Sequence, residues 1–220
     1  MTNYKRALIL LHGSGGDGMS LSKDIKNLYP NFFSLLETSN IKVILPTSSI
    51  RPYSLLNGEK IRVWHDRSSL SYDSIEDKEG LIKTGTFIKK IISDLWVVDK
   101  IDISNIIIGG FSMGGGVALH FALSEWYDFQ AVICISSYVT TKSDIWTKNE
   151  NTLISFNINP KILMIHGEED LLIPIEWSQK TRDLLLLKNY DVNWFKYKGV
   201  KHELSFNILE YIVKYVIDIL

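Results

Sequence analysis

Short apolar runs alternate with longer amphipathic segments along most of this 220-residue chain. The short runs are rich in Ile, Leu and Val, which is typical of parallel strands that are covered on both faces. Six strands are expected, over residues 6–11, 41–45, 105–108, 131–135, 161–165 and 193–197.

The segments between these runs repeat apolar residues every three or four positions, which predicts amphipathic helices. Helices are expected over about 20–28, from Pro30 towards Thr38, over 79–96, after Ser112, from near Pro174, and over about 204–220. Alternation of strands and helices favours an α/β fold: a three-layer sandwich with a mostly parallel central sheet, formed by residues 1–220 as a single domain.

Residues 46–78 break this alternation. The segment is polar, contains Pro46, Pro52 and the pair Asn57-Gly58, and is long for a connection between elements. Connections of this length are usually functional or flexible. We expect a short strand within it, near residues 61–64.

Composition narrows the choice of function. Hydrophobic residues make up 45% of the chain and charged residues 22%, which is ordinary globular usage and excludes a disordered chain or a coiled coil. With 24 basic and 25 acidic residues there is no basic excess, so no nucleic-acid partner is expected. No apolar stretch is long enough for stable membrane insertion. Nothing in the sequence predicts an oligomeric state.

Cys134 is the only cysteine, which excludes an internal disulfide framework and fits a reducing compartment, so we expect a cytosolic location. It lies inside an apolar run with no base beside it, and is expected to be a core residue. The histidines do not show metal-ligand spacing, so no metal and no cofactor are expected.

The most informative segment is residues 110–114, Gly-Phe-Ser-Met-Gly, which fits the pattern G-x-S-x-G. A buried strand precedes it and a helical pattern follows, which is the context that this motif requires. In that context Ser112 is a nucleophile held on a tight turn, whereas the alternative is a glycine-rich turn with an incidental serine. Gly110 and Gly114 would allow the strand and the helix to approach closely.

A serine nucleophile needs a base, and the sequence order in this kind of site is serine, acid, histidine. Of the five histidines, His12 and His65 precede Ser112, His120 lies on the following helix, and His166 ends a strand. His202 remains, in the loop between the last strand and the last helix, and is the expected base.

The orienting acid is expected in the loop after residues 161–165. Three carboxylates follow there, on Glu168, Glu169 and Asp170. Asp170 directly precedes an apolar run that leads to Pro174, so it is expected to turn inward, with the two glutamates as alternatives.

The first glycine-rich loop allows two interpretations. Gly13, Gly15 and Gly18 fit the dinucleotide fingerprint G-x-G-x-x-G, but the acidic residue that should end the second strand is missing. The other interpretation is an oxyanion hole, formed by the backbone N–H groups of Ser14 and Met113. Glycines would then let the loop approach the reacting carbon.

Several of these segments together resemble the acyl-protein thioesterase/lysophospholipase family of α/β-hydrolases. They are His-Gly-Ser-Gly-Gly at 12–16, Val-Trp-His-Asp-Arg at 63–67, Gly-Gly-Phe-Ser-Met-Gly-Gly at 109–115, His-Gly-x-x-Asp at 166–170 and His-Glu-Leu-Ser at 202–205. The segments at 109–115 and 202–205 are most similar to the lysophospholipase-like protein 1 branch.

This resemblance implies that Ser112, Asp170 and His202 are the catalytic triad, that the backbones of Ser14 and Met113 form the oxyanion hole, and that Trp64 lies near the substrate groove. It also implies hydrolysis of acyl esters or thioesters without a cofactor. Thioesterases of the family commonly have leucine, glutamine and phenylalanine where this chain has Ser14, Met113 and His65, which leaves the substrate open.

The sequence therefore predicts a serine hydrolase that acts on a small-molecule ester or an acylated protein. The interrupted apolar pattern of residues 57–71, around Ile61, Val63, Trp64 and Leu70, favours a shallow groove and short acyl chains. The alternatives are a long-chain palmitoyl-protein thioesterase or lysophospholipase, and, in another class, a non-catalytic binding module with a hydrolase fold.

Overall fold

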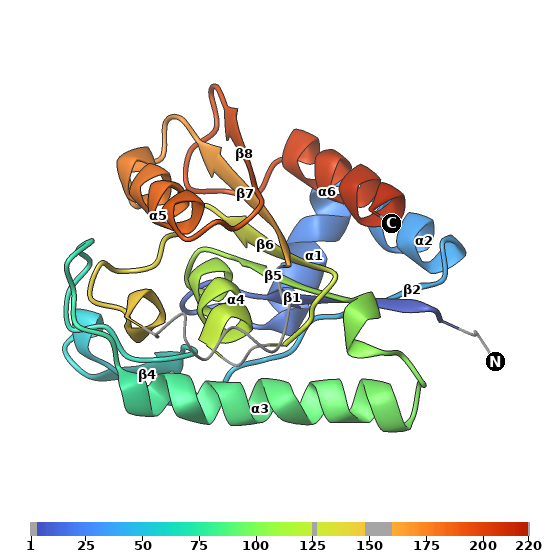
Figure 1. The fold of residues 1–220 in the computed structure, drawn as a ribbon. Helices are drawn as coiled ribbons and strands as arrows, with labels where there is room; N and C mark the ends of the chain where they lie inside the picture. The colour runs from blue at the N-terminus through green and yellow to red at the C-terminus, as the bar shows by residue number, and fades with distance from the viewer. Residues whose placement is uncertain (1–3, 125–126, 148–159, 220) are drawn as a thin grey trace.

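The structure is a computed structural model that describes residues 4–124, 127–147 and 160–219. Its centre is a six-stranded parallel sheet in the order β2-β1-β5-β6-β7-β8 (Figure 1). The strands are β1 (Arg6–Leu11), β2 (Ile41–Ile44), β5 (Ile106–Phe111), β6 (Ala131–Ile135), β7 (Lys161–Gly167) and β8 (Val192–Tyr197). All six expected strands are confirmed.

Two strands run further than the sequence pattern indicates. β5 continues through Gly109 and Gly110 to Phe111, because these residues still pair with Ile133, Cys134 and Ile135 of β6. β7 likewise continues through His166 to Gly167, paired with β8. Glycines that suggest a turn in the sequence are here the last part of a central strand.

Helices cover both faces of the sheet, so the expected three-layer sandwich is confirmed. Alternate residues of β1 point to opposite faces, Ala7 and Ile9 to one core and Leu8 and Leu10 to the other. The helices on the first face are α3 (Lys78–Val97), α4 (Met113–Ser124) and α5 (Ile175–Leu187), and those on the second are α1 (Gly18–Leu28), α2 (Phe32–Thr38) and α6 (Phe206–Asp218). The expected end of the last helix at Leu220 lies outside the described residues. Among the helices of the described ranges, none is both long enough and apolar enough to cross a membrane.

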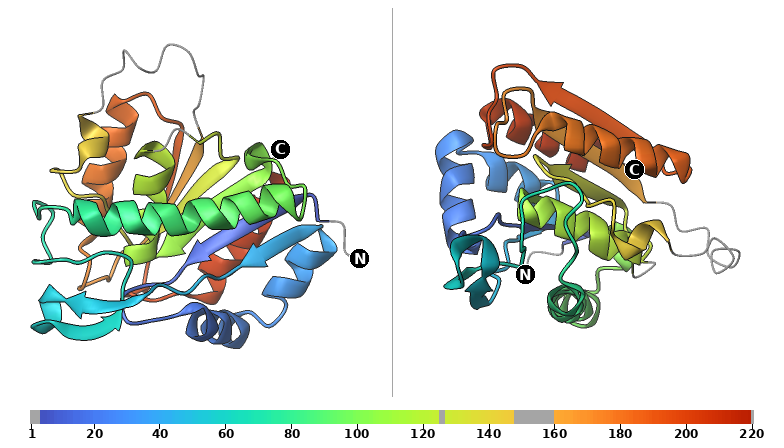
Figure 2. Two further views of the ribbon diagram at one scale, coloured as in Figure 1. Left: turned by 90° about the horizontal axis from the view of Figure 1, so that it is seen from below. Right: turned by 90° about the vertical axis from the view of Figure 1, so that its left-hand side faces the viewer.

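The long connection of residues 46–78 contains a two-stranded hairpin that is separate from the main sheet (Figure 2). Its strands are β3 (Ile50–Tyr53) and β4 (Glu59–Arg62), and they pair antiparallel. The tight turn between them has positive φ angles at Asn57 and Gly58. The strand expected near residues 61–64 therefore exists but ends at Arg62, because Val63 and Trp64 enter the core.

The parallel sheet places the loops after β1, β5, β7 and β8 at one edge, since the strands all end there. The predicted site residues lie in those four loops or directly after them, except Trp64, which lies in the long connection of residues 46–78. Ligands of open α/β sheets bind at this carboxyl edge.

Helix α4 begins unusually close to the strands beneath it. A Cβ atom added to Gly114 would lie 2.3 Å from the carbonyl oxygen of Leu11 and 2.6 Å from that of His12. Backbone atoms cannot rotate away as the end of a side chain can, so only glycine fits at this position.

Gly114→Ala is therefore expected to lower the free energy of unfolding by at least about 1–3 kcal/mol, the usual effect of overpacking. Gly16→Ala is the matched control, because its Cβ would meet its nearest neighbour at an ordinary 3.4 Å. Urea denaturation of both variants measures the difference. Equal denaturation midpoints would show that α4 can shift without cost.

His65 follows the hairpin and is buried, with 8% of its surface exposed. Its Nδ1 lies 2.7 Å from the carbonyl oxygen of Asp66, and a carbonyl only accepts, so Nδ1 carries the proton and donates. Burial, assisted by the positive charge of Arg67, lowers the pKa of His65 from 6.5 to about 3. The folded protein thus holds a neutral imidazole where an unfolded chain would take up a proton.

Between pH 6.5 and about 3 the unfolded state binds one more proton at His65 than the folded state does, so stability must fall as the pH falls through this window. His65→Phe and His65→Gln remove this titration and should both flatten the decline, by up to about 1.4 kcal/mol per pH unit. Unfolding free energies at pH 7, 5 and 4 provide the measurement. A decline as steep in both variants as in the wild type would contradict a neutral buried His65.

Candidate active site

Ser112 lies at the sharp turn between β5 and α4. Its φ is +53°, a left-handed conformation that is uncommon for serine and typical of a strained functional turn. The turn is held on both sides, because the N–H of Ser112 donates to the carbonyl of Ile135 (2.9 Å) and its carbonyl accepts from the N–H of Gly115 (2.9 Å). These bonds fix the direction of the hydroxyl. Ser112 is almost buried, with 9% of its surface exposed.

His202 reaches Ser112 from the loop between β8 and α6. Its Nε2 lies 2.9 Å from Oγ of Ser112, and its Nδ1 lies 2.7 Å from Oδ2 of Asp170. A carboxylate only accepts, so Nδ1 carries the proton and Nε2 is free to accept from the serine hydroxyl. The ring packs against Phe111, with ring centroids 5.0 Å apart, which limits its rotation.

Asp170 is buried, and its carboxylate is held from several directions. Oδ1 accepts from the backbone N–H groups of Leu172 (3.0 Å) and Ile173 (2.8 Å). Burial alone would raise the pKa of Asp170, but hydrogen bonds from His166 and His202 and from the Ile173 N–H outweigh it and hold that pKa well below its usual range. The carboxylate is therefore ionised throughout the neutral range.

The other two carboxylates of this loop do not reach the site. Glu168 and Glu169 are exposed, and Glu168 pairs with Lys196 at 3.2 Å. Of the three acids that the sequence offers, Asp170 is the one that lies beside His202.

His166 is a contact of Asp170 that the sequence did not single out. It is fully buried, and its Nε2 lies 2.8 Å from the carbonyl oxygen of Ile173 and 3.4 Å from Oδ2 of Asp170. The spacing His-x-x-x-Asp was visible in the sequence. What could not be read from it is that β7 continues to Gly167, which points the ring inward beneath the loop.

The loop after β1 lies against the serine. A Cβ atom on Gly13 would be 3.2 Å from Cβ of Ser112, so this backbone lies against the Ser112 side chain. Oγ of Ser14 lies 3.7 Å from Sδ of Met113. Met113 is the first residue of α4, so its N–H has no acceptor within the helix. Ser14 and Met113 are thus brought together beside Ser112.

The remaining two residues expected near the substrate have other contacts. The N–H of Gly15 donates to the carbonyl of Arg62 (2.8 Å), which ties the loop to the hairpin. Trp64 was expected beside the groove, but only 1% of its surface is exposed, and its Nε1–H donates to the carbonyl of His12 (2.8 Å). A buried indole N–H needs an acceptor, and here it finds one behind the loop, away from the open groove.

An open groove of about 480 Å³ lies beside His202 and Phe111, the residue before Ser112. Residues 57–71, whose interrupted apolar pattern was the reason for expecting a shallow groove, do not line it. Three other segments line the groove: the loop after β1, helix α1, and the residues from His202 onward. The lining residues are His12, Gly13, Ser14, Gly16, Ser20, Leu21, Asp24, Asn27, Leu28, Phe111, His202, Glu203 and Leu204.

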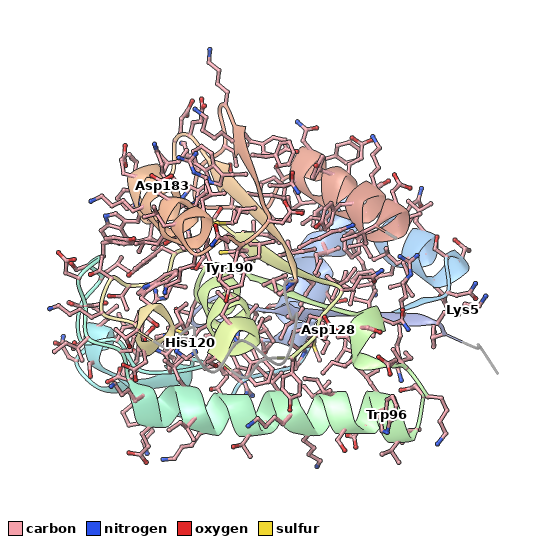
Figure 3. The ribbon with its side chains drawn as sticks, viewed as in Figure 1. Lys5, Trp96, His120, Asp128, Asp183 and Tyr190 are labelled. Atoms are coloured by element: carbon pink, nitrogen blue, oxygen red, sulfur yellow. The ribbon has the colours of Figure 1, made fainter. Side chains whose placement is uncertain are left out.

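The other reactive side chains are placed away from this chemistry. Burial raises the pKa of the Cys134 thiol to about 12, so it is not a thiolate at neutral pH. His120 lies on α4 towards α3, 3.5 Å from Glu76 (Figure 3). Across residues 4–124, 127–147 and 160–219 there is no group of three or more His, Cys, Asp or Glu side chains that could hold a metal ion.

Comparisons with known proteins agree with the fold. The model of the phospholipase/carboxylesterase family matches residues 2–219. Lysophospholipase-like protein 1 of Mus musculus is 29% identical to this chain, over 97% of this chain and 87% of that protein. Acyl-protein thioesterase 1 of Yarrowia lipolytica is 25% identical, over 97% of this chain and 91% of that protein.

Solved structures are similar over nearly the same span. The crystal structure of acyl-protein thioesterase 2 of Zea mays has a TM-score of 0.78 at 24% identity and covers 97% of this chain and 93% of that one. At this identity the likeness is evidence for the fold alone. The family match extends over almost the entire sequence, and the family resemblance noted in the sequence is confirmed: the chain belongs to the phospholipase/carboxylesterase family and is a hydrolase with the α/β-hydrolase fold.

Proposed function

We propose that this chain hydrolyses carboxylic esters or thioesters through a triad of Ser112, His202 and Asp170. The observation that carries the proposal is the continuous pair of hydrogen bonds from Ser112 Oγ to His202 Nε2 (2.9 Å) and from His202 Nδ1 to Asp170 Oδ2 (2.7 Å). Nucleophile and base are within hydrogen-bond reach, and the base is oriented by a third group, as activation of a serine requires.

In this mechanism His202 takes the proton of Ser112 as Oγ attacks the acyl carbon. The same proton is then given to the leaving oxygen or sulfur, and a water molecule repeats the sequence on the acyl-enzyme. Asp170 keeps the proton of the imidazole on Nδ1 and stabilises the imidazolium that forms. The depressed pKa of Asp170 supports this role, because the acid must stay ionised.

The negative charge on the carbonyl oxygen would be stabilised by the backbone N–H groups of Ser14 and Met113. Their closeness supports this assignment, as does the position of Met113 at the start of α4, where unpaired N–H groups and the helix dipole favour negative charge. Gly13 allows the loop to approach the reacting carbon, because any side chain there would press on Ser112.

The packing beside the triad favours short acyl chains. Tyr72, Tyr138 and Trp177 pack against one another with ring centroids 4.8–6.5 Å apart, next to the buried side chain of Ile173. Ile173 follows Asp170 in the loop, and Tyr138 follows the end of β6, so these rings fill apolar space at the same sheet edge as Ser112. The groove that remains open includes the carboxylates of Asp24 and Glu203.

The substrate would be a small carboxylic ester, in line with the description of the family, or an acyl group carried by a protein, in line with the name of one relative. A cytosolic location is proposed on the single-cysteine composition. The competing function from another class is a binding module that uses the groove without chemistry. Treatment with a fluorophosphonate probe tests the two directly: covalent labelling of Ser112, located by peptide mass spectrometry, is expected for the hydrolase, and an unmodified Ser112 for the binding module.

Ser112→Ala and His202→Ala are each expected to lower kcat by about 10³–10⁶, and the double variant should be little worse, because triad residues act as a unit. Initial rates on a soluble ester, corrected for spontaneous hydrolysis, measure the loss. The same substitution at Ser104, exposed in the turn before β5, is the control for preparation and folding.

Two results would contradict the triad. One is near-normal turnover in a pure preparation of Ser112→Ala. The other is a double variant whose loss equals the product of the two single losses, which would mean that the residues act independently.

Acyl length is the second test of the site. Each methylene removed from water contributes about 0.8 kcal/mol, so a deep apolar channel would reward every added carbon. With the apolar space occupied by aromatic rings, kcat/KM should be higher for acetyl to hexanoyl substrates than for palmitoyl ones. Matched oxygen esters and thioesters of increasing length, kept below their micelle concentrations, provide the series.

A kcat/KM that rises steadily from butyryl to palmitoyl would contradict the shallow groove. It would favour the alternative substrate class, the long acyl chains of a palmitoyl-protein thioesterase or lysophospholipase.

A further inference from the structure

His12 is a buried histidine at the end of β1 that the proposed chemistry does not use. Only 1% of its surface is exposed, and both ring nitrogens have partners. Nε2 lies 3.0 Å from the backbone nitrogen of Ser48, and Nδ1 lies 2.7 Å from the carbonyl oxygen of Gly13.

These partners determine where the proton is. The N–H of Ser48 can only donate, so Nε2 must accept and carries no hydrogen. The carbonyl of Gly13 can only accept, so Nδ1 must carry the hydrogen and donate it. Burial lowers the pKa of His12, which favours the same neutral ring. His12 is therefore fixed in one of its two tautomers.

The carbonyl that His12 holds belongs to the peptide unit of the proposed oxyanion hole. The C=O of Gly13 and the N–H of Ser14 lie in one planar peptide group, and none of the peptide bonds in the described ranges is cis. In a trans peptide these two bonds point in opposite directions. Holding the Gly13 oxygen therefore sets the direction of the Ser14 N–H.

The same oxygen accepts a second bond, from the N–H of Gly16 at 3.2 Å. This bond closes a turn across Ser14 and Gly15, and the φ of +79° at Gly15 is the value that a type II turn requires at its third residue. The central peptide of this turn, between Ser14 and Gly15, is held separately, because the Gly15 N–H donates to the carbonyl of Arg62 at 2.8 Å. The His12 ring adds a second donor on the Gly13 oxygen, which belongs to the peptide that carries the Ser14 N–H.

The imidazole is itself held in place. Its ring lies against the Trp64 indole with centroids 4.8 Å apart, and the Trp64 Nε1–H donates to the His12 carbonyl. Ser48 and Trp64 come from the connection that contains the hairpin. The ring thus links that connection to the peptide beside Ser112.

We propose that His12 is a positioning residue of the oxyanion hole: its Nδ1–H holds the Gly13 carbonyl so that the Ser14 N–H faces the developing oxyanion. The inference rests on the proposed ester hydrolysis and adds a residue to it. The competing explanation is that His12 only fills space under the loop, in which case its hydrogen on Nδ1 is of no consequence for the reaction.

Two variants distinguish these explanations, because each can replace only one of the two hydrogen bonds that the imidazole makes. In His12→Asn the amide nitrogen lies near the position of Nδ1 and can still donate to the Gly13 oxygen. In His12→Gln the longer amide reaches the position of Nε2, so it can bind Ser48 but leaves the Gly13 oxygen without this donor. Both are uncharged, polar and smaller than histidine, and asparagine is the smaller of the two, so the loss of a purely space-filling role would be at least as large in His12→Asn as in His12→Gln.

The measurements are kcat and KM on a soluble short-chain ester, the inhibition constant of phenylboronic acid, and the melting temperature. A boronic acid forms a tetrahedral adduct on a serine and places an oxygen where the oxyanion would be. His12→Gln is expected to lower kcat by about 10²–10³, the effect of losing one oxyanion donor, with KM nearly unchanged. It should also bind phenylboronic acid more weakly. In His12→Asn, kcat and the affinity for phenylboronic acid should each fall by less than about tenfold.

Equal losses in the two variants, or a loss of kcat in His12→Gln without weaker boronic acid inhibition, would overturn the proposal. Side-chain NMR of histidine in the wild type provides a test that does not depend on variants folding: the Nδ1–H tautomer of His12 supports the proposal, and the Nε2–H tautomer excludes it. Ester turnover by the wild type distinguishes failure of the proposed function from failure of the proposed role of His12. If the wild type is inactive, the proposed function fails, whereas an active wild type with an equally active His12→Gln overturns the role of His12 alone.

Discussion

The close approach of α4 to the end of β1 is the constraint on which the site depends. Gly114 lets the first turn of the helix lie almost in contact with the carbonyls of Leu11 and His12. That approach places Met113 beside Ser14 and keeps Gly13 against Ser112. If the helix began farther away, Ser112 could still meet His202, but Ser14 and Met113, which carry the proposed oxyanion donors, would no longer lie side by side.

Much of this arrangement was predictable from the sequence, because it follows from local patterns and strand order. The six apolar runs identify the strands, and residues 110–114 identify the turn with its serine. Parallel strands end at one edge, so a loop histidine after the last strand and an acid after the one before it had to lie near that turn. His202 and Asp170 could be chosen without coordinates for this reason.

The rest depends on side-chain directions that a sequence pattern does not contain. Trp64 was expected beside the groove from the family resemblance, and Val63 from the apolar pattern of residues 57–71, but both side chains turn into the core. His12 was set aside because it precedes the serine in the chain, an argument about catalytic order that has no bearing on a supporting role. The extension of β7, which turns His166 towards Asp170, depends on pairing with β8 at the sheet edge.

The proposed triad joins residues that lie far apart in the chain, and this separation bears on folding as well as on the proposed catalysis. Ser112 and His202 are 90 positions apart, and the loop that holds Ser14, one of the proposed oxyanion donors, follows the first strand. Contacts between distant segments form late, because the chain loses entropy in closing a long loop before these contacts can stabilise it. Helices and single strands can form while the site is still incomplete. During refolding, hydrolytic activity should therefore return after the secondary structure, and only when the last strand has joined the sheet.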